Sequence, residues 1–171
     1  MIFLETKRLY LRSFQLSDIE ELFDYRNAEH CTRFQRGQLR ERADLEALIL
    51  RRQNDAFLTE GKKQLAIGFK DDTLIGEITI FNQAAIVMGY TLSYKHHRKG
   101  YAYEMLSAVI AALHHAYPTK EFLCFVEFEN VASIRLLKKL GFDALGVDSE
   151  ENALVFGKYS HAETIEKYKE C

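Results

Sequence analysis

Two hydrophobic periods run along the chain, and the change from one to the other separates strands from helices. Between residues 64 and 93, short runs rich in Ile, Val, Leu and Phe are separated by the polar pairs Asp71-Asp72 and Asn82-Gln83. Short polar links between such runs are typical of antiparallel strands joined by tight turns. The pattern therefore predicts an antiparallel meander in this part of the chain.

Helices are predicted where apolar residues recur three and four positions apart. Residues 101–116 place Met105, Val109 and Leu113 on one face, and Pro118 follows where the helix is expected to have ended. The full set of predicted elements is a strand over 7–14, a helix opened by the capping box Ser17-x-x-Glu20, a loop over 28–40, a helix over 42–57, strands over 64–70, 73–81 and 85–93, a basic loop over 94–99, a helix over 101–116, a strand over 122–128, a helix over 131–140 closed by Gly141, strands over 142–147 and 153–160, and a polar tail helix.

The order of these elements predicts the fold class. The strand over 85–93, the helix over 101–116 and the strand over 122–128 form a βαβ unit, so the two strands are expected to be parallel with a right-handed crossover. We therefore predict an α+β (mixed α/β) fold: a central mixed, mostly antiparallel sheet with one parallel pair and helices on both faces. Because the sequence contains no repeat, low-complexity tract or linker, residues 1–171 are predicted to form a single domain.

Composition narrows the functional classes. The net charge of −2 offers no strongly basic surface for nucleic acid or for a membrane. The apolar run at the N-terminus is too short for a signal peptide, and no stretch approaches a membrane span. The cysteines Cys31, Cys124 and Cys171 are far apart and lack zinc-ligand spacing. We expect a cytoplasmic protein that binds neither nucleic acid nor membrane and holds no metal ion.

The most informative segment lies between the predicted strand over 85–93 and the helix that follows it. Its sequence over 96–104 is His-His-Arg-Lys-Gly-Tyr-Ala-Tyr-Glu. Gly100 and the small Ala102 allow the backbone to approach an anion closely at a helix N-terminus, and Arg98 and Lys99 add positive charge. The segment is therefore either a diphosphate-binding loop or a solvated basic loop, and it matches neither of the common nucleotide-binding glycine motifs.

This segment resembles the Gln/Arg-x-x-Gly-x-Gly/Ala motif of the Gcn5-related N-acetyltransferase (GNAT) superfamily. His97 stands here at the Gln/Arg position, and Arg98 stands where glycine is common. Four stretches resemble the RimJ/RimL-like ribosomal-protein alanine acetyltransferase branch in the correct order, and together they span nearly the whole chain: ETKRLYLRSFQLSDIEELF (5–23), LIGEITIF (74–81), GYAYEML (100–106) and NVASIRLLKKLGF (130–142).

The resemblance implies acetyl-CoA as acyl donor, no metal, and a splayed parallel strand pair that holds the pantetheine arm. It implies that the strand end near Leu92 pairs with the pantetheine amides, and that Asn130 and Ser133 approach the thioester. The pyrophosphate would be held by Arg98, Lys99, Gly100, Tyr101 and Ala102.

Acetyl transfer to an amine needs a proton acceptor for the amine and a proton donor for the leaving thiolate. The strand over 85–93 holds no carboxylate, so the nearest candidate base is Glu77, with a water chain or a solvent-facing role for Glu77 as alternatives. Many superfamily members place a tyrosine acid where this chain has Leu137, and the RimL-like branch suggests Ser133 instead. Alternatively, Asn130 caps the helix and Ser133 lies in its first turn.

The acceptor side is less defined by the sequence. By resemblance, the polar region around Tyr25, Arg26 and residues 33–37 forms the substrate wall, and the pairs at 51–52 and 62–63 are expected on solvated faces. We expect an N-acetyltransferase for a protein N-terminal amine or a small-molecule amine. The alternative is a non-catalytic CoA-binding regulatory module of the same fold. The exposed last strand of such a sheet is able to pair across a homodimer.

Overall fold

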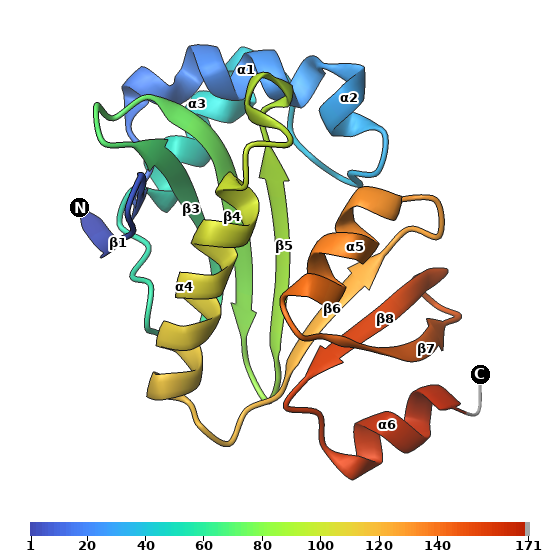
Figure 1. The fold of residues 1–171 in the computed structure, drawn as a ribbon. Helices are drawn as coiled ribbons and strands as arrows, with labels where there is room; N and C mark the ends of the chain where they lie inside the picture. The colour runs from blue at the N-terminus through green and yellow to red at the C-terminus, as the bar shows by residue number, and fades with distance from the viewer. Residues whose placement is uncertain (170–171) are drawn as a thin grey trace.

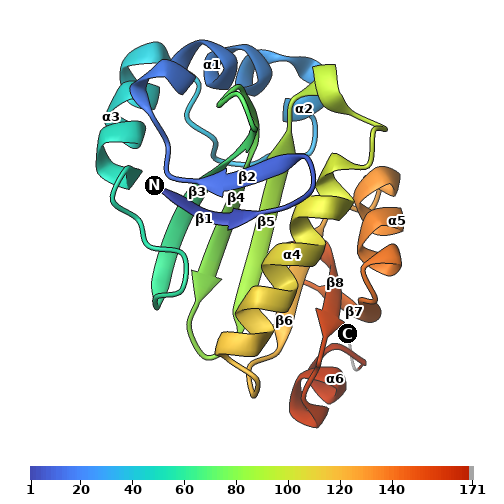
Figure 2. The ribbon, with the colours of Figure 1, turned by 60° about the vertical axis from the view of Figure 1, so that its left-hand side comes forward.

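A computed structural model describes residues 1–169, which form one eight-stranded sheet with helices on both faces (Figures 1 and 2). The strands are β1 (Ile2–Glu5), β2 (Leu9–Arg12), β3 (Gly61–Phe69), β4 (Leu74–Asn82), β5 (Ile86–Leu92), β6 (Phe122–Val126), β7 (Asp143–Asp148) and β8 (Ala153–Lys158). The helices are α1 (Ile19–Asn27), α2 (Glu29–Thr32), α3 (Arg42–Arg52), α4 (Tyr101–Ala116), α5 (Val131–Lys139) and α6 (Ala162–Lys169), with 3-10 turns at Leu16–Asp18 and Tyr94–His96.

The sheet order is β1-β2-β3-β4-β5-β6-β8-β7. Six of the neighbouring pairs are antiparallel, and β5 pairs with β6 in parallel across the α4 crossover. This arrangement confirms the predicted fold class and the βαβ unit. The edge strands of the sheet are β1 and β7, and β8, the last strand along the chain, lies between β6 and β7. A homodimer itself stays a prediction.

Strand alternation gives the sheet two different faces. Ile78 and Ile80 of β4 belong to the large core beneath α4 and α5, on the side we call the α4 face. On the opposite side, which we call the α1 face, helices α1 and α3 pack their own apolar cluster against the sheet, including Leu22, Leu45 and Ile49. The side chains of Glu77 and other alternate β4 residues therefore point toward the α1 face.

The structure departs from the sequence prediction near the N-terminus. The apolar run at 2–5 forms β1, which pairs with β2, and α2 lies in the region predicted as a loop. The predicted Ser17-x-x-Glu20 capping box is wrong, since α1 begins at Ile19 and its N-cap residue, Asp18, makes no side-chain cap bond.

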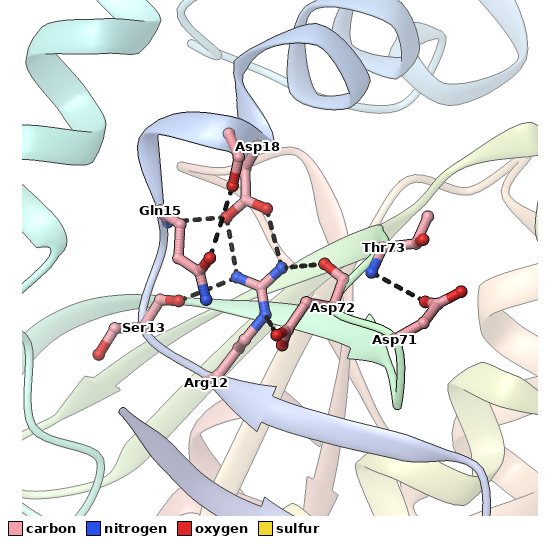
Figure 3. Close-up of polar contacts among 8 residues, drawn as sticks. Arg12, Ser13, Gln15, Asp18, Asp71, Asp72 and Thr73 are labelled. Carbon is pink, nitrogen blue, oxygen red and sulfur yellow. Dashed lines mark hydrogen bonds and ion pairs between the residues drawn. The ribbon is translucent and has the colours of Figure 1, made fainter.

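Asp18 is instead the partner of a buried arginine (Figure 3). Arg12 is only 1% exposed, and two of its guanidinium nitrogens donate to the two Asp18 carboxylate oxygens at 2.8 Å each. Further bonds join the guanidinium to the carbonyls of Ser13 (3.0 Å) and Asp72 (2.7 Å). A charge buried this deeply needs an oppositely charged partner, which explains why the Asp18 carboxylate binds the Arg12 guanidinium instead of capping α1.

Candidate active site

The phosphate loop, residues 97–102, joins the 3-10 turn after β5 to the first turn of α4. Gly100 is the N-cap residue with φ +79°, and Arg98 also has a positive φ of +59°. A left-handed conformation favours glycine, which gives a physical reason for glycine being common at the Arg98 position of the motif. Arg98 adopts this conformation although it is a non-glycine residue, for which a positive φ is disfavoured.

The start of α4 presents free amides. The first helical bond runs from Glu104 N–H to the Gly100 carbonyl at 3.0 Å. Among residues 1–169, no protein acceptor binds the N–H groups of Gly100, Tyr101, Ala102 or Tyr103. Unpaired N–H groups at the positive end of a helix form a site suited to a phosphate.

An arginine from the N-terminal hairpin supports this loop. Arg8 Nε donates to Glu104 Oε2 at 2.6 Å, Arg8 NH1 donates to the Lys99 carbonyl at 3.0 Å, and the guanidinium lies 4.4 Å from the centre of the Tyr101 ring. Burial alone would raise the pKa of Glu104, but the hydrogen bonds from Thr6 and Arg8 outweigh it and lower that pKa. Glu104 thus anchors β1–β2 to the loop, a role the sequence did not reveal.

Strands β5 and β6 separate after a short pairing. Their parallel register covers only Ile86 with Phe122 and Val87 with Leu123. Beyond these pairs lies a cavity of about 210 Å³, whose lining includes Gly89, Tyr90, Cys124, Val126, Asn130, Ser133 and Leu137. The splayed pair implied by the resemblance is therefore present.

The edge of β5 that faces this gap is partly occupied. Ser93 N–H donates to the Ile75 carbonyl on β4, so the backbone groups of Leu92 and Tyr90 point to the opposite edge. The Leu92 carbonyl already contacts the His97 ring nitrogen at 2.8 Å and the Cys31 thiol at 3.4 Å. The pairing of Leu92 with the pantetheine amides stays a prediction, and the Leu92 carbonyl is bound within the chain.

Two hydroxyl groups meet across the gap. Tyr90 on β5 donates its phenolic proton to Ser133 Oγ on α5 at 2.9 Å. Burial raises the pKa of Tyr90 to about 12, although the bond to Ser133 acts in the opposite direction. The Asn130 side chain accepts from Ser133 N–H at 3.2 Å, so Asn130 does cap α5. Leu137 is buried and lines the same cavity as this pair.

Glu77 has a partner that the sequence did not predict. Its two carboxylate oxygens accept from Arg26 Nε at 2.9 Å and from Arg26 NH2 at 2.6 Å, and both side chains are nearly inaccessible to solvent. The solvent-facing alternative for Glu77 is therefore excluded. Tyr25 lies fully buried beside them, where burial, and then the Glu77 charge, raise its pKa well above its usual value.

A second, larger cavity of about 590 Å³ opens on the α1 face. Arg26 and the segment 35–39 line it, as does Glu77, while Tyr25 lies in the core and Arg33 pairs with Glu129 at 3.4 Å. The two cavities share a common border whose residues are Gln35, Arg36, Met88, Gly89, Tyr90 and Phe125. The two cavities therefore adjoin along β5.

Residues 1–169 contain neither a cluster of metal-binding side chains nor a helix able to span a membrane. No three His, Cys, Asp or Glu side chains lie close enough together there to share a metal ion. None of the helices in that range combines the length and apolar character needed to cross a bilayer.

Known proteins share both the sequence pattern and the fold. The chain is 32% identical to the uncharacterized N-acetyltransferase YoaA of Bacillus subtilis over 151 residues, which cover 84% of each chain. An acetyltransferase of the GNAT family from Bacillus anthracis has the same fold, with a TM-score of 0.77, 17% identity and coverage of 91% of this chain and 96% of that one. RimL, a ribosomal L7/L12 alpha-N-protein acetyltransferase solved with Coenzyme A, superposes with a TM-score of 0.73 at 16% identity, covering 92% of this chain and 97% of RimL.

The family assignment rests on the sequence itself. The profile of the family described as "Acetyltransferase (GNAT) domain" matches residues 8–143, which include β2, the phosphate loop and α5. Solved structures of RimJ and RimL share the fold of this chain at 17% and 16% identity, and the RimJ/RimL-like branch stays what the four stretches predict. The chain belongs to the GNAT acetyltransferase family and is an acyltransferase.

Proposed function

We propose that residues 1–171 act as a single cytoplasmic N-acetyltransferase domain that moves an acetyl group from acetyl-CoA to a primary amine. The observation that carries this proposal is the meeting of two cavities at Gly89 and Tyr90 of β5, the strand that the phosphate loop follows in the chain. A donor and an acceptor that enter from opposite faces would then reach each other between β5 and β6.

The residues on the donor side fit the chemistry of acetyl-CoA, which supplies an acetyl group as a thioester. The amides of residues 100–103 bind the pyrophosphate, with Lys99 and Arg98 adding positive charge. The Leu92 N–H, on the edge of β5 that faces the gap, pairs with a pantetheine carbonyl. Asn130 fixes the first turn of α5, and this holds Ser133 toward the gap.

Tyr90 and Ser133 form the proposed proton donor. Because Tyr90 donates to Ser133 Oγ, the Ser133 hydroxyl is free to donate its own proton into the cavity toward a departing thiolate. Tyr90 holds its proton at neutral pH, as an ordinary phenol does, and burial raises its pKa further, to about 12. This pair supplies the acid that Leu137 cannot supply, and it favours catalysis over the non-catalytic alternative.

Glu77 remains the proposed base. Each of its carboxylate oxygens has a second lone pair beyond the bond to Arg26, and one of these is available to an amine N–H or to a water on the acceptor side. Arg26 then has the role of a positioning residue, since it fixes the direction in which the carboxylate points.

The test is a screen of amine acceptors in which free thiol is measured as CoA is released and mass spectrometry identifies the products. We expect stoichiometric release of CoA and a mass increase of one acetyl group on at least one primary amine. Binding of acetyl-CoA with no transfer to any peptide or small amine would instead support a CoA-binding module.

A further inference from the structure

The larger cavity carries information about the acceptor. It lies on the α1 face and meets the donor side at Gly89 and Tyr90. Its volume of about 590 Å³ is within the usual range for a small ligand or for the first few residues of a peptide. If the chain is the N-acetyltransferase proposed above, this cavity is where the amine substrate binds.

Positive charge dominates the lining of this cavity. Four cationic side chains line it against one carboxylate, Glu77, which Arg26 already neutralises. Arg36 is paired with Glu127. The other two, Arg51 and Lys62, are exposed and have no ion-pair partner within residues 1–169. We call Arg51 and Lys62 the cationic rim; it is a local feature in a chain whose net charge is −2.

The interior of the cavity is neutral and able to form hydrogen bonds. Gln38 donates its amide N–H to Thr91 Oγ at 3.1 Å, which leaves Gln38 Oε1 buried without a partner. An unpaired buried carbonyl is costly unless a donor reaches it, and a substrate N–H is such a donor. Thr91 is the cross-strand neighbour of Glu77, so these polar groups gather at the end of the cavity nearest the proposed base.

Sheet register gives the separation between the rim and Gly89, where the two cavities meet. Lys62 on β3 pairs with Phe81 on β4, and Phe81 pairs with Val87 on β5. Gly89 lies two residues beyond Val87 along β5. Two strand spacings and two residues of rise put the Lys62 and Gly89 Cα atoms about 12 Å apart. An extended peptide advances about 3.4 Å per residue, so acidic side chains about two to four residues from the N-terminus reach the rim.

We propose that the acceptor is the N-terminal amine of a peptide or protein with acidic residues within its first few positions. The rim attracts these carboxylates, and the same positive charge disfavours a protonated amine, so it helps to present the neutral nucleophile. Polyamines and other polycations are excluded by this charge. The proposal rests on the acetyl-transfer function, and it specifies the substrate class of the same site.

The experiment compares amidated tetrapeptides that begin with Ala and continue with three Asp, three Asn or three Lys residues, together with an aliphatic diamine. We expect kcat/KM, measured from CoA release, to be highest for the Asp peptide, lower for the Asn peptide and lowest for the Lys peptide. The Asp and Lys peptides should differ at least tenfold at low salt, and this difference should shrink as salt is added. The Arg51→Glu/Lys62→Glu double variant should reverse the ranking. Lys138→Glu, on the α4 face, is the matched control and should keep it.

Calorimetric titration of the same peptides into CoA-loaded protein separates two kinds of failure. Equal rates, or a preference for Lys peptides in the parent protein, would overturn the acidic-acceptor inference while leaving acetyl transfer intact. Preferential binding of the Asp peptide without any turnover would overturn the proposed function and keep the assignment of the site. If the protein shows no turnover and no preferential binding of the Asp peptide, both proposals are overturned.

Discussion

Gly100 adopts a left-handed backbone conformation where the phosphate loop enters α4, with φ +79°. A β-branched side chain is strongly disfavoured at that φ, and the loop must shift to relieve it. We therefore expect Gly100→Val to lose at least tenfold in CoA affinity by calorimetric titration. The position is exposed, so circular dichroism should show a folded protein.

Lys99→Ala serves as the comparison for Gly100→Val. The Lys99 ammonium is exposed and contacts the Lys95 carbonyl at 3.0 Å. Lys99→Ala therefore removes one partly screened charge and leaves the backbone N–H groups of the loop in place. Its loss of CoA affinity should be only a few-fold. A folded Gly100→Val protein with unchanged CoA affinity would show that the pyrophosphate binds elsewhere.

Glu77→Gln should lower kcat more than it changes acetyl-CoA affinity. Without the carboxylate, the reaction depends on acceptor amine that is already neutral, and this form becomes scarcer as the pH falls. The loss should therefore be greatest at low pH in a pH–rate profile. Arg26→Gln is the control, because it breaks the same ion pair and retains the carboxylate. If both variants shift the profile in the same way, Glu77 is a structural partner and a water relay removes the proton.

Tyr90→Phe should lower kcat by about 10 to 100-fold with little change in KM for acetyl-CoA, since it removes the donor to Ser133. Ser133→Ala should have a similar effect, and the double variant should be no worse than the more severe single variant. Additive losses would show that the two hydroxyl groups act separately.

The same substitution has a signature in stability. Tyr90 has a raised pKa of about 12 in the folded state, so the native protein holds its proton more tightly than the unfolded chain does between about pH 10 and 12. This contribution is complete below pH 10 and is lost as the pH rises through 12. Urea unfolding should thus show a shallower alkaline decline for Tyr90→Phe than for the parent protein, by up to ~1.4 kcal/mol per pH unit.

At the scale of elements, the Arg12–Asp18 pair holds the start of α1 and the β3–β4 turn to β2 (Figure 3). Arg12→Met leaves Asp18 buried without its partner, and breaking such a pair typically costs about 3–5 kcal/mol. We expect a loss of this size in the free energy of unfolding. The Arg12→Met/Asp18→Leu double variant should recover much of it, and failure to recover would show that the backbone bonds of Arg12 matter more than the charge.

Elements of regular period were predictable from the sequence, and contacts between distant segments were not. The α5 helix and its closing Gly141 follow local rules, and the structure has Gly141 at φ +82° with its N–H bonded to the Lys138 carbonyl. In contrast, Glu77 and Arg26 are 51 residues apart, and their ion pair depends on how α1 lies over the sheet.

The same limit applies at both walls of the candidate site. Tyr90 was visible only as one of several apolar or aromatic residues of its strand, and its contact with Ser133 spans 43 residues. The Arg8–Glu104 contact spans 96 residues, although Arg8 belongs to a stretch that resembles the family. Local patterns identified the loop and the helix, but the partners that orient them are set by the packing of the whole sheet.

At the scale of the whole molecule, the candidate donor site is assembled from both ends of the sheet. The β1–β2 hairpin supports the phosphate loop through Arg8, β5 and β6 form the gap, and α5 closes it with Ser133. A ligand that touches all three regions is bound only by the folded state. Acetyl-CoA should therefore stabilise the global transition rather than one local segment.

We expect saturating acetyl-CoA to raise the melting temperature by several degrees. At 100 times the dissociation constant, native-state binding adds about 2.7 kcal/mol, and a domain of about 150–250 residues shifts by about 2–4 °C for each kcal/mol. The measurement is a thermal melt of the parent protein with and without acetyl-CoA, and with CoA alone. Gly100→Val should show a much smaller shift at the same ligand concentration, because its weaker binding reduces the mass-action term. A parent protein whose melting temperature does not move with either ligand would contradict the assignment of the phosphate loop and the strand gap as the donor site, since a ligand with no preference for the native state cannot stabilise it.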